Sequence, residues 1–322
     1  MIVLLFTGGT ISMRHDAAAG GAVPRLSARE IIAATRGIEE VADLEIEDWG
    51  AFPGPHMTME RMWALRGRIR ELVARDDVQG VVLTHGTDSL EESAYLCARS
   101  LATRKPIVFT GAMRAASDLG WDGPANLLDS ARVAASDEAA GYGVMVVMGS
   151  RIYAGVDVTK VHTHALDAFE SPGLGPIGVV DDGRVIFRRA VANGADVLDP
   201  PALGLPVDIV LAWAGADSRL VDASLATARG LVVSAMGRGN VPPAMVDGIA
   251  RWIAEDKPVV ITSRAMRGRV GPTYGYPGGG RRLTEMGAIL GGSRRPQQAR
   301  IELALAIGLG MDREGVREIL NG

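Results

Sequence analysis

Cysteine is nearly absent from this chain of 322 residues, which contains one, Cys97. A single cysteine excludes an internal disulfide bond. Cys97 lies in the run Ser-Ala-Tyr-Leu-Cys-Ala at residues 93–98, a pattern typical of the inner face of a helix. We therefore expect this thiol to pack in the core as a small apolar group, rather than to react.

Long apolar runs and an excess of basic residues are also lacking. No stretch approaches the roughly 20 apolar residues that a membrane-spanning helix needs. The apolar residues 2–6 are too few for a signal peptide and follow no basic segment, so a cytoplasmic protein is expected. The net charge of −4 argues against nucleic-acid binding, which requires a basic face. We expect neither membrane nor nucleic acid among the partners.

Short apolar runs alternate with helical patterns along the chain. Runs rich in Val, Ile and Leu are each followed by a turn containing glycine, at residues 2–6, 80–83, 106–109 and 144–148. Buried strands that alternate with helices indicate a parallel sheet covered on both faces. One of the helices is expected over residues 59–74, where apolar side chains recur at helical spacing.

A segment rich in Pro, Gly and Asp divides this pattern into two series. The predicted fold class is α/β with two α/β domains. The larger N-terminal domain, residues 1–190, should contain a mostly parallel sheet with flanking helices. Residues 191–205 are the predicted linker, and residues 206–322 form a smaller C-terminal α/β domain.

The first candidate site is the turn Thr-Gly-Gly-Thr-Ile at residues 7–11, directly after the first apolar run. Ligands bind at such strand-end turns in parallel sheets. Gly8 and Gly9 allow a sharp turn and close approach of the backbone to a ligand, and Thr10 can project a hydroxyl beyond them. The alternative is a phosphate-binding loop, although neither G-x-G-x-x-G nor a P-loop lysine is present. The spacing alone leaves both open.

The second candidate is Thr-His-Gly-Thr-Asp-Ser at residues 84–89. Ser89 and Glu92 form a capping-box pattern, which predicts that a helix begins directly after Asp88. Thr87 and Asp88 would then lie at a helix N-terminus, where free N–H groups and the helix dipole favour negative charge. Asp88 could instead cap the helix, but Ser89 already supplies a cap. A functional role for Asp88 is therefore favoured.

The third candidate is Asp-Val-Thr-Lys at residues 157–160, which could supply a general base. A lysine acts as a base only when neutral, a state that burial favours and a nearby carboxylate opposes. A cluster of Thr, Lys and Asp would let the hydroxyl relay protons while the carboxylate orients the lysine. On its own, Lys160 is equally compatible with a solvated surface lysine. His85 is expected to be a buried, hydrogen-bonded side chain rather than a catalyst.

Taken together, these motifs resemble those of bacterial L-asparaginases. The family's order and spacing are matched at residues 7–11, 85–88 and 157–160, and by Gly-Ala-Met-Arg at residues 111–114. Residues 122–127 and 296–300 extend the resemblance, which covers nearly the whole chain.

The resemblance implies a role for each matching residue. Thr10 would be the nucleophile that forms an acyl-enzyme and releases ammonia. Thr87, Asp88 and Lys160 would form a second triad, with Asp88 also holding the amino group of the substrate. The remaining expected substrate contacts are Gly9, Gly86, Ala112, His56, Asn240, Tyr274 and Tyr276.

The resemblance also implies partners and cofactors. No metal or organic cofactor is expected, and the partner is a small amide substrate. Members of the family are typically homotetramers whose sites lie between subunits. A homo-oligomer, dimer or tetramer, is therefore expected, with Asn240 reaching the site of a neighbour.

Three departures from the family pattern bear on the substrate. The lid, Met13–Leu26, lacks the usual tyrosine: its only ionisable ring is His15, and the small residues 17–22 suggest mobility. After Trp49 the usual serine is absent and His56 stands near the position of an acidic residue. The acidic residue of the second domain has no clear match, and Tyr274 or Tyr276 is a candidate substitute.

The sequence therefore predicts an amidohydrolase that converts L-asparagine to L-aspartate and ammonia through a threonine acyl-enzyme. One alternative is an amidase for a different small amide, because the loop Gly54–Met57 is altered. Another is a catalytically weak amide-binding or sensor protein. The intact set of nucleophile and base disfavours a sensor, since a binding protein needs neither.

Overall fold

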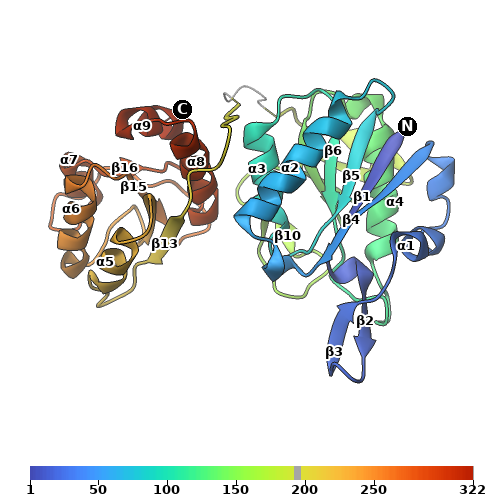
Figure 1. Ribbon diagram of the computed structural model, residues 1–322, viewed down its shortest axis with the longest axis horizontal. Helices are drawn as coiled ribbons and strands as arrows, with labels where there is room; N and C mark the ends of the chain where they lie inside the picture. The colour runs from blue at the N-terminus through green and yellow to red at the C-terminus, as the bar shows by residue number, and fades with distance from the viewer. Residues whose placement is uncertain (192–196, 322) are drawn as a thin grey trace. The chain divides into compact units, whose positions relative to one another are not determined.

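The computed structural model describes residues 1–191 and 197–321, which divide into two compact units, Met1–Asp196 and Val197–Gly322 (Figure 1). Each unit has its own sheet, flanking helices and hydrophobic core, which confirms the predicted fold class of two α/β domains. The predicted linker falls partly on residues 192–196, outside the described residues. The boundaries at residues 190 and 206 stay predictions.

Unit 1 is built on an eight-stranded sheet with the order β12-β11-β8-β7-β6-β5-β1-β4. The neighbours β4, β1, β5, β6 and β7 run parallel, whereas β8, β11 and β12 join by antiparallel pairing. The strands are β1 (Ile2–Gly8), β4 (Leu44–Phe52), β5 (Gly80–Thr84), β6 (Ile107–Thr110), β7 (Val144–Met148), β8 (Arg151–Ala154), β11 (Gly178–Asp181) and β12 (Arg184–Phe187). Continuous burial of β1, β5, β6 and β7 explains their uninterrupted apolar sequences.

Helices cover both faces of this sheet. On one face α4 (Gly123–Ala135) packs on the central strands with α1 (Ala28–Ala34) beside it. The other face carries α2 (Met59–Ala74) and α3 (Leu90–Ser100), which contact each other (Figure 1). α2 has the predicted bounds, because its apolar side chains form one buried stripe. Cys97 of α3 is buried as predicted, and burial raises the pKa of its thiol to about 12.

The lid segment forms an antiparallel hairpin of β2 (Met13–Asp16) and β3 (Gly21–Pro24). The small residues between the strands supply its turn, in which Asp16 Oδ1 accepts hydrogen bonds from the backbone N–H groups of Ala18 and Ala19 at 2.9 and 3.0 Å. Asp16 also pairs with Arg25. The small residues that suggest mobility thus include the turn of this hairpin, and their mobility stays a prediction.

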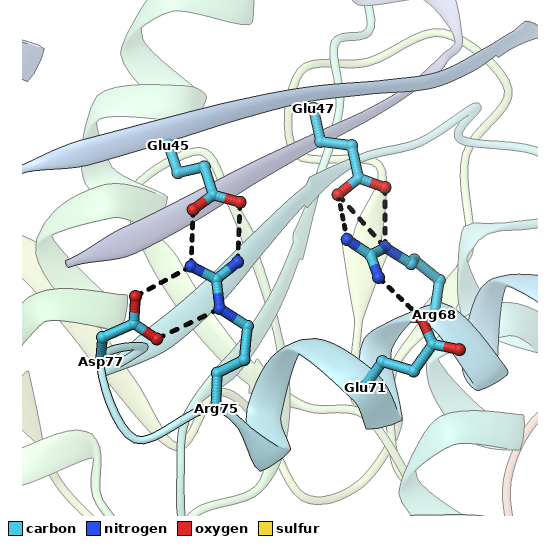
Figure 2. A network of polar contacts seen from close by, with 6 residues as sticks. All are labelled: Glu45, Glu47, Arg68, Glu71, Arg75 and Asp77. Carbon is cyan, nitrogen blue, oxygen red and sulfur yellow. Dashed lines mark hydrogen bonds and ion pairs between the residues drawn. The ribbon is translucent and has the colours of Figure 1, made fainter.

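The edge strand β4 is fastened to α2 and the turn after it by a network of charged side chains (Figure 2). Glu47 accepts paired hydrogen bonds from Arg68 of α2, and Glu45 accepts a second pair from Arg75. Asp77 also accepts from Arg75, and Glu71 from Arg68. Every second side chain of this part of β4 is thus charged and points toward α2. Charged side chains on an edge strand discourage its pairing with an edge strand of another sheet.

Unit 2 has a four-stranded parallel sheet in the order β13-β14-β15-β16. Its strands are β13 (Val207–Leu211), β14 (Gly230–Ala235), β15 (Val259–Ser263) and β16 (Ile289–Leu290), and its helices are α5 (Arg219–Leu225), α6 (Val246–Ala254), α7 (Gly280–Met286), α8 (Pro296–Gly308) and α9 (Arg313–Asn321). A short 3-10 turn, Pro243–Met245, leads into α6. No helix in the described part of the chain is long and apolar enough to span a membrane.

Candidate active site

Three loops of unit 1 meet at the carboxyl edge of the sheet, because the strands that precede them are parallel neighbours. Phe6 of β1 pairs with Thr84 of β5, and Thr84 pairs with Thr110 of β6. The Thr-Gly-Gly-Thr, His-Gly-Thr-Asp and Gly-Ala-Met-Arg motifs follow these strand ends. The edge is where parallel sheets of this kind bind ligands.

The glycines of these motifs let the loops touch through their backbones. Gly9 has a φ of 88°, and a Cβ there would lie 2.6 Å from the backbone nitrogen of Gly86. A Cβ at Gly86 would in turn collide with the backbone of Gly54, in the loop after β4. Side chains at Gly9 or Gly86 would therefore push the three loops apart.

Thr10 begins a 3-10 turn, Thr10–Ser12, directly after β1. The preceding Gly9 is held from both sides: its N–H donates to the carbonyl of Phe52 at 3.0 Å, and its carbonyl accepts from Ser12 Oγ at 2.8 Å. Thr10 itself is half-buried. The turn thus presents the predicted nucleophile in a loop that touches Gly86, the residue before Thr87.

Thr87, Asp88 and Lys160 form one hydrogen-bonded cluster. Lys160 lies on the two-residue strand β9 (Thr159–Lys160), which pairs with β10 (Phe169–Glu170). Its Nζ donates to Thr87 Oγ1 at 2.9 Å and to Asp88 Oδ1 at 2.7 Å. The side chain of Lys160 is 15% exposed and that of Asp88 is 58% exposed. Asp88 is therefore the member of the cluster that solvent, or a ligand, can reach.

The Gly-Ala-Met-Arg loop is fixed beside Thr87 by two side chains of the helix α4 region. A Cβ on Gly111 would lie 2.6 Å from the carbonyl oxygen of His85, which leaves no room for a larger residue, and 3.3 Å from Thr87 Cγ2. Asn126 Nδ2 donates to the carbonyl of Gly111 at 3.0 Å, and the carboxylate of Asp122 accepts from the N–H groups that follow Ala112. Ala112 is fully buried. These contacts explain why residues 122–127 accompany the loop motif.

The predicted capping box at the start of α3 is wrong. The helix begins at Leu90, as expected, but Ser89 makes no side-chain cap to it. Ser89 Oγ instead donates to the carbonyl of Gly54 at 2.7 Å. The Ser89 hydroxyl bonds to Gly54 rather than to the helix, because Gly54 packs directly against the backbone of Asp88, the residue before Ser89. Ser89 thus ties the loop after β4 to the cluster, and it does not cap the helix in place of Asp88.

His85 is buried beneath the cluster, as predicted. Its Nδ1 lies 2.9 Å from the carbonyl of Gly86, and its Nε2 lies 2.8 Å from Ser93 Oγ. Because a carbonyl oxygen only accepts, Nδ1 carries the hydrogen and Nε2 accepts from the serine. Burial lowers the pKa of His85 to about 4, against a smaller opposing effect of the Gly86 carbonyl. The ring is therefore neutral near pH 7 and supports the loop rather than exchanging protons.

Glu91 is a buried residue that sequence reasoning missed. It lies on α3, and its Oε2 accepts a hydrogen bond from Thr159 Oγ1 at 2.6 Å and another from the backbone N–H of Lys160. Acidic residues are common in the first turn of a helix, so its position carried no distinctive signal. Contact with a strand 68 residues away arises only in the folded chain.

The other predicted substrate contacts stay predictions. His56 is exposed on the 3-10 turn Gly54–His56, and its carbonyl accepts from Arg61. In unit 2, Asn240 Oδ1 accepts from the N–H of Gly280 at 3.2 Å. Tyr274 and Tyr276 are stacked with ring centroids 5.5 Å apart. Among the residues that the structure describes, no group of three or more His, Cys, Asp or Glu side chains is placed to hold a metal ion.

Comparison with known proteins relates both units to one family. Residues 1–193 match the family model "Asparaginase, N-terminal", and residues 206–320 match "Glutaminase/Asparaginase C-terminal domain". The "Probable L-asparaginase" of Deinococcus radiodurans is 39% identical over 322 residues, which cover 99% of this chain and 96% of that protein. The "L-asparaginase" of Bacillus licheniformis is 32% identical, with 98% of each chain covered.

A solved structure agrees with these matches. The crystal structure of "Probable Cytoplasmic L-asparaginase from Campylobacter jejuni" has a TM-score of 0.88 and 30% identity, and covers 99% of this chain and 98% of its own. Both family models, the two relatives and this structure thus extend over nearly the whole chain. The protein belongs to the asparaginase family.

Proposed function

We propose that the protein hydrolyses the side-chain amide of L-asparagine to L-aspartate and ammonia through an acyl-enzyme on Thr10. The observation that carries the proposal is the contact of Lys160 with both Thr87 and Asp88, at 2.9 and 2.7 Å. This cluster adjoins the loop of a half-buried threonine hydroxyl. Membership of the asparaginase family supports the reaction class.

In the first half-reaction, Thr10 Oγ attacks the amide carbon of the substrate. The hydrogen-bonded pair of Lys160 and Thr87 takes up the proton that Thr10 releases and returns it to the departing nitrogen. The carbon–nitrogen bond breaks, ammonia leaves, and an ester to Thr10 remains. α3 begins two residues after Asp88, so its N-terminal N–H groups favour the negative charge that develops during attack.

In the second half-reaction, water attacks the ester. The same base takes a proton from this water, and the proton passes to Thr10 Oγ as the ester bond breaks. Aspartate leaves, and the threonine hydroxyl is restored. In each half-reaction the same base therefore takes up a proton and then returns it. The side chains end the cycle with the protons that they had at the start.

Asp88 is assigned a second role, in binding the α-ammonium group of the substrate. Lys160 donates to one carboxylate oxygen, Oδ1, and we assign Oδ2 to the ammonium. The exposure of this side chain, 58%, makes it accessible. Backbone groups of Gly9, Gly86 and Ala112, together with His56, Asn240, Tyr274 and Tyr276, complete the proposed substrate contacts.

The test of this proposal is ammonia release from L-asparagine by the purified chain, with L-glutamine and small amides for comparison. Turnover of L-asparagine with a Thr10 ester trapped by mass spectrometry would support it. Faster turnover of another small amide would favour the alternative amidase, an idea motivated by the absence of serine from residues 50–57. Binding of L-asparagine without ammonia release would favour a sensor and contradict the proposal.

We also propose that the chain acts in the cytoplasm as a homo-oligomer, dimer or tetramer, whose sites are shared between subunits. The similarity to a Campylobacter jejuni protein described as probable cytoplasmic supports the location. Light scattering tests the oligomer, and cell fractionation tests the location. Coexpression of Thr10→Ala with Asn240→Ala chains should restore part of the activity if each site draws residues from two chains. Lack of complementation would contradict shared sites.

A further inference from the structure

Glu91 links the helix that follows the Thr87–Asp88 loop to the strand that carries Lys160. It is the second residue of α3, which begins at Leu90, and it is 8% exposed. A single carboxylate oxygen, Oε2, accepts from Thr159 Oγ1 at 2.6 Å and from the backbone N–H of Lys160. One side chain thus binds both residues of β9.

The backbone pairing of β9 is short. It is two residues long and pairs only with the equally short β10, of which Glu170 lies opposite Thr159. Such a short two-stranded pair is weakly held by its own hydrogen bonds. Hydrogen bonds to a carboxylate are shorter and roughly twice as strong as those between neutral groups. The bonds to Glu91 therefore add a direct restraint on the strand, beside the backbone bond from Val161 to Ala168 at 2.7 Å and the burial of Thr159.

The position of this strand decides what Lys160 can reach. Four rotatable side-chain bonds separate its backbone from Nζ, which contacts Thr87 Oγ1 and Asp88 Oδ1 at the same time. Both contacts require that the Cα stay at a fixed distance from the loop. α3 continues directly from the loop of Thr87 and Asp88. Because Glu91 lies on α3, its bonds to β9 fix the distance between this strand and that loop. A misplacement of about 1 Å in a catalytic group can lower a rate about a hundredfold.

We propose that Glu91 is a positioning residue for Lys160: it holds the backbone of the lysine so that Nζ bridges Thr87 and Asp88. The contact geometry stands by itself, whereas the expected effect on turnover rests on the proposed function. Glu91 touches no substrate in this proposal. The rival explanation is that Glu91 only stabilises the fold, with no particular effect on Lys160.

The scarcity of lysine in the chain provides a direct test. Only Lys105, Lys160 and Lys257 are present, so limited acylation with acetic anhydride followed by peptide mass spectrometry reports three amines separately. In the natural protein Lys160 should react slowly, because its side chain is 15% exposed and doubly hydrogen-bonded. Glu91→Ala should raise the labelling of Lys160 roughly tenfold relative to Lys257, as loss of a charged hydrogen bond implies. Lys105 and Lys257 should keep their rates.

Two further variants guard against misfolding and against an effect of charge alone. Glu91→Asp keeps the charge but shortens the side chain, and it should also release Lys160, by a smaller factor. Glu92→Ala is the matched control: it removes the same charge from the same helical turn at a half-buried position, and it should leave Lys160 labelling unchanged. Unchanged Lys160 labelling in both Glu91 variants would overturn the proposal, and so would equal labelling after the Glu92 change.

The activity of the full chain gives the second readout. Glu91→Ala should lower kcat for L-asparagine about a hundredfold, with KM changed less than about threefold. Glu91→Gln, which keeps an acceptor oxygen, should recover most of this loss. In a Lys160→Met background, Glu91→Ala should cost no further activity, because it acts through the lysine. Additive losses would overturn the proposal. If the natural protein releases no ammonia, the proposed function fails, whereas the labelling experiment still decides the role of Glu91.

Discussion

Lys160 and Thr87 lie 73 residues apart in the chain, and the Nζ of one donates to the Oγ1 of the other across 2.9 Å. The hydroxyl belongs to a loop after a central strand, and the amine to a two-residue strand beyond β8. Only the folded sheet brings the two groups together. An amine and a hydroxyl in direct contact are the pair of groups that the proposed proton transfer requires.

Replacement of Thr10 by alanine should abolish hydrolysis while the fold persists. The side chain is half-buried at a loop, so its loss removes a hydroxyl and creates no large cavity. Loss of a covalent nucleophile should lower kcat at least about a thousandfold. Ammonia release measures the rate, and L-aspartate binding by calorimetry checks that the site persists. A variant with more than about a tenth of the natural activity would assign the nucleophile elsewhere, with Thr87 the next candidate.

Lys160→Met should lower kcat about 10² to 10⁴-fold, because it removes the proposed base. Lys160→Arg is the sharper variant, since a guanidinium can donate to Asp88 but cannot take up a proton near pH 7. Both should be impaired in turnover and retain substrate binding. Lys257→Met, in unit 2, serves as the matched control and should keep its rate. A Lys160→Met enzyme slowed only a few-fold would transfer the role of base to His15 or a tyrosine.

His56 tests whether the loop after β4 determines substrate choice. Its ring is exposed near Gly54, which packs against Asp88, and the serine typical of the family is absent. If His56 binds the α-carboxylate, His56→Ala should raise KM for L-asparagine, because it removes that contact. If the ring faces away, both enzymes should use L-asparagine weakly and prefer amides with a smaller or uncharged α-substituent.

Either orientation of His56 predicts a higher KM for L-asparagine than a serine-containing relative shows, and still poorer use of L-glutamine. A panel of small amides at several pH values, measured on both enzymes, distinguishes the two. A micromolar KM for L-asparagine that His56→Ala leaves unchanged would show that this loop has no bearing on recognition.

The central strands were predictable because burial on both faces leaves a continuous apolar sequence, as in β1 and β5. No strand is predicted from the sequence over Leu44–Phe52. There, glutamates alternate with apolar residues, and their arginine partners lie 21 and 30 residues further along, on a helix and the turn after it. Such alternation is compatible with a strand that has one charged face, but the ion pairs that fix this edge cannot be read from the local sequence.

The candidate site likewise contains residues that the sequence predicts and residues that it does not. Thr87, Asp88 and Lys160 were found because strand ends and family motifs mark them, and the fold places them in contact. The local sequence predicts that Ser89 caps α3. In the folded chain its hydroxyl donates instead to the carbonyl of Gly54, which is distant in sequence. Glu91 escaped notice for the same physical reason: its partner, β9, is distant in sequence.

The network on β4 should contribute to stability mainly through its better-buried pair. Glu47 and Arg68 form three hydrogen bonds, at 2.9, 3.2 and 2.8 Å, with side chains 25% and 34% exposed. Glu47→Gln should therefore lower the free energy of unfolding by up to about 1 kcal/mol at low salt. Glu71→Gln is the matched control, because Glu71 pairs with the same arginine while 67% exposed, and its loss should be nearly neutral. Urea titrations that give equal losses would contradict this ranking.

The acid sensitivity of the same network has a definite sign. Hydrogen bonds from Arg75 lower the pKa of Glu45 and of Asp77 below their ordinary values. A carboxylate with a lowered folded-state pKa stabilises the fold above its unfolded pKa, and this contribution is lost as pH falls through the folded one. Arg75→Met should therefore flatten the decline of stability below about pH 4.5. An unchanged decline, in urea titrations between about pH 5 and pH 3, would assign the acid sensitivity to other groups.

His85 should make stability depend on pH in a higher range. Its pKa is lowered from 6.5 to about 4 by burial, so between these values the unfolded chain binds a proton that the folded chain does not. Stability should then fall as pH decreases from about 6.5 to about 4, by at most about 3 kcal/mol from this residue. His85→Gln can still donate to Gly86 and accept from Ser93, but it does not take up a proton.

The His85→Gln substitution should therefore cost stability at about pH 7.5 and lose less on acidification to about pH 5, so that the two free energies of unfolding converge. The matched control is His15→Gln on the exposed β2–β3 hairpin, which removes a histidine without removing a buried one. It should leave the slope of stability against pH unchanged, because this ring is exposed in the folded chain. The two proteins could instead show parallel slopes of stability against pH. His85 would then gain its proton inside the fold, and the neutral state assigned to its ring beneath Gly86 would be wrong.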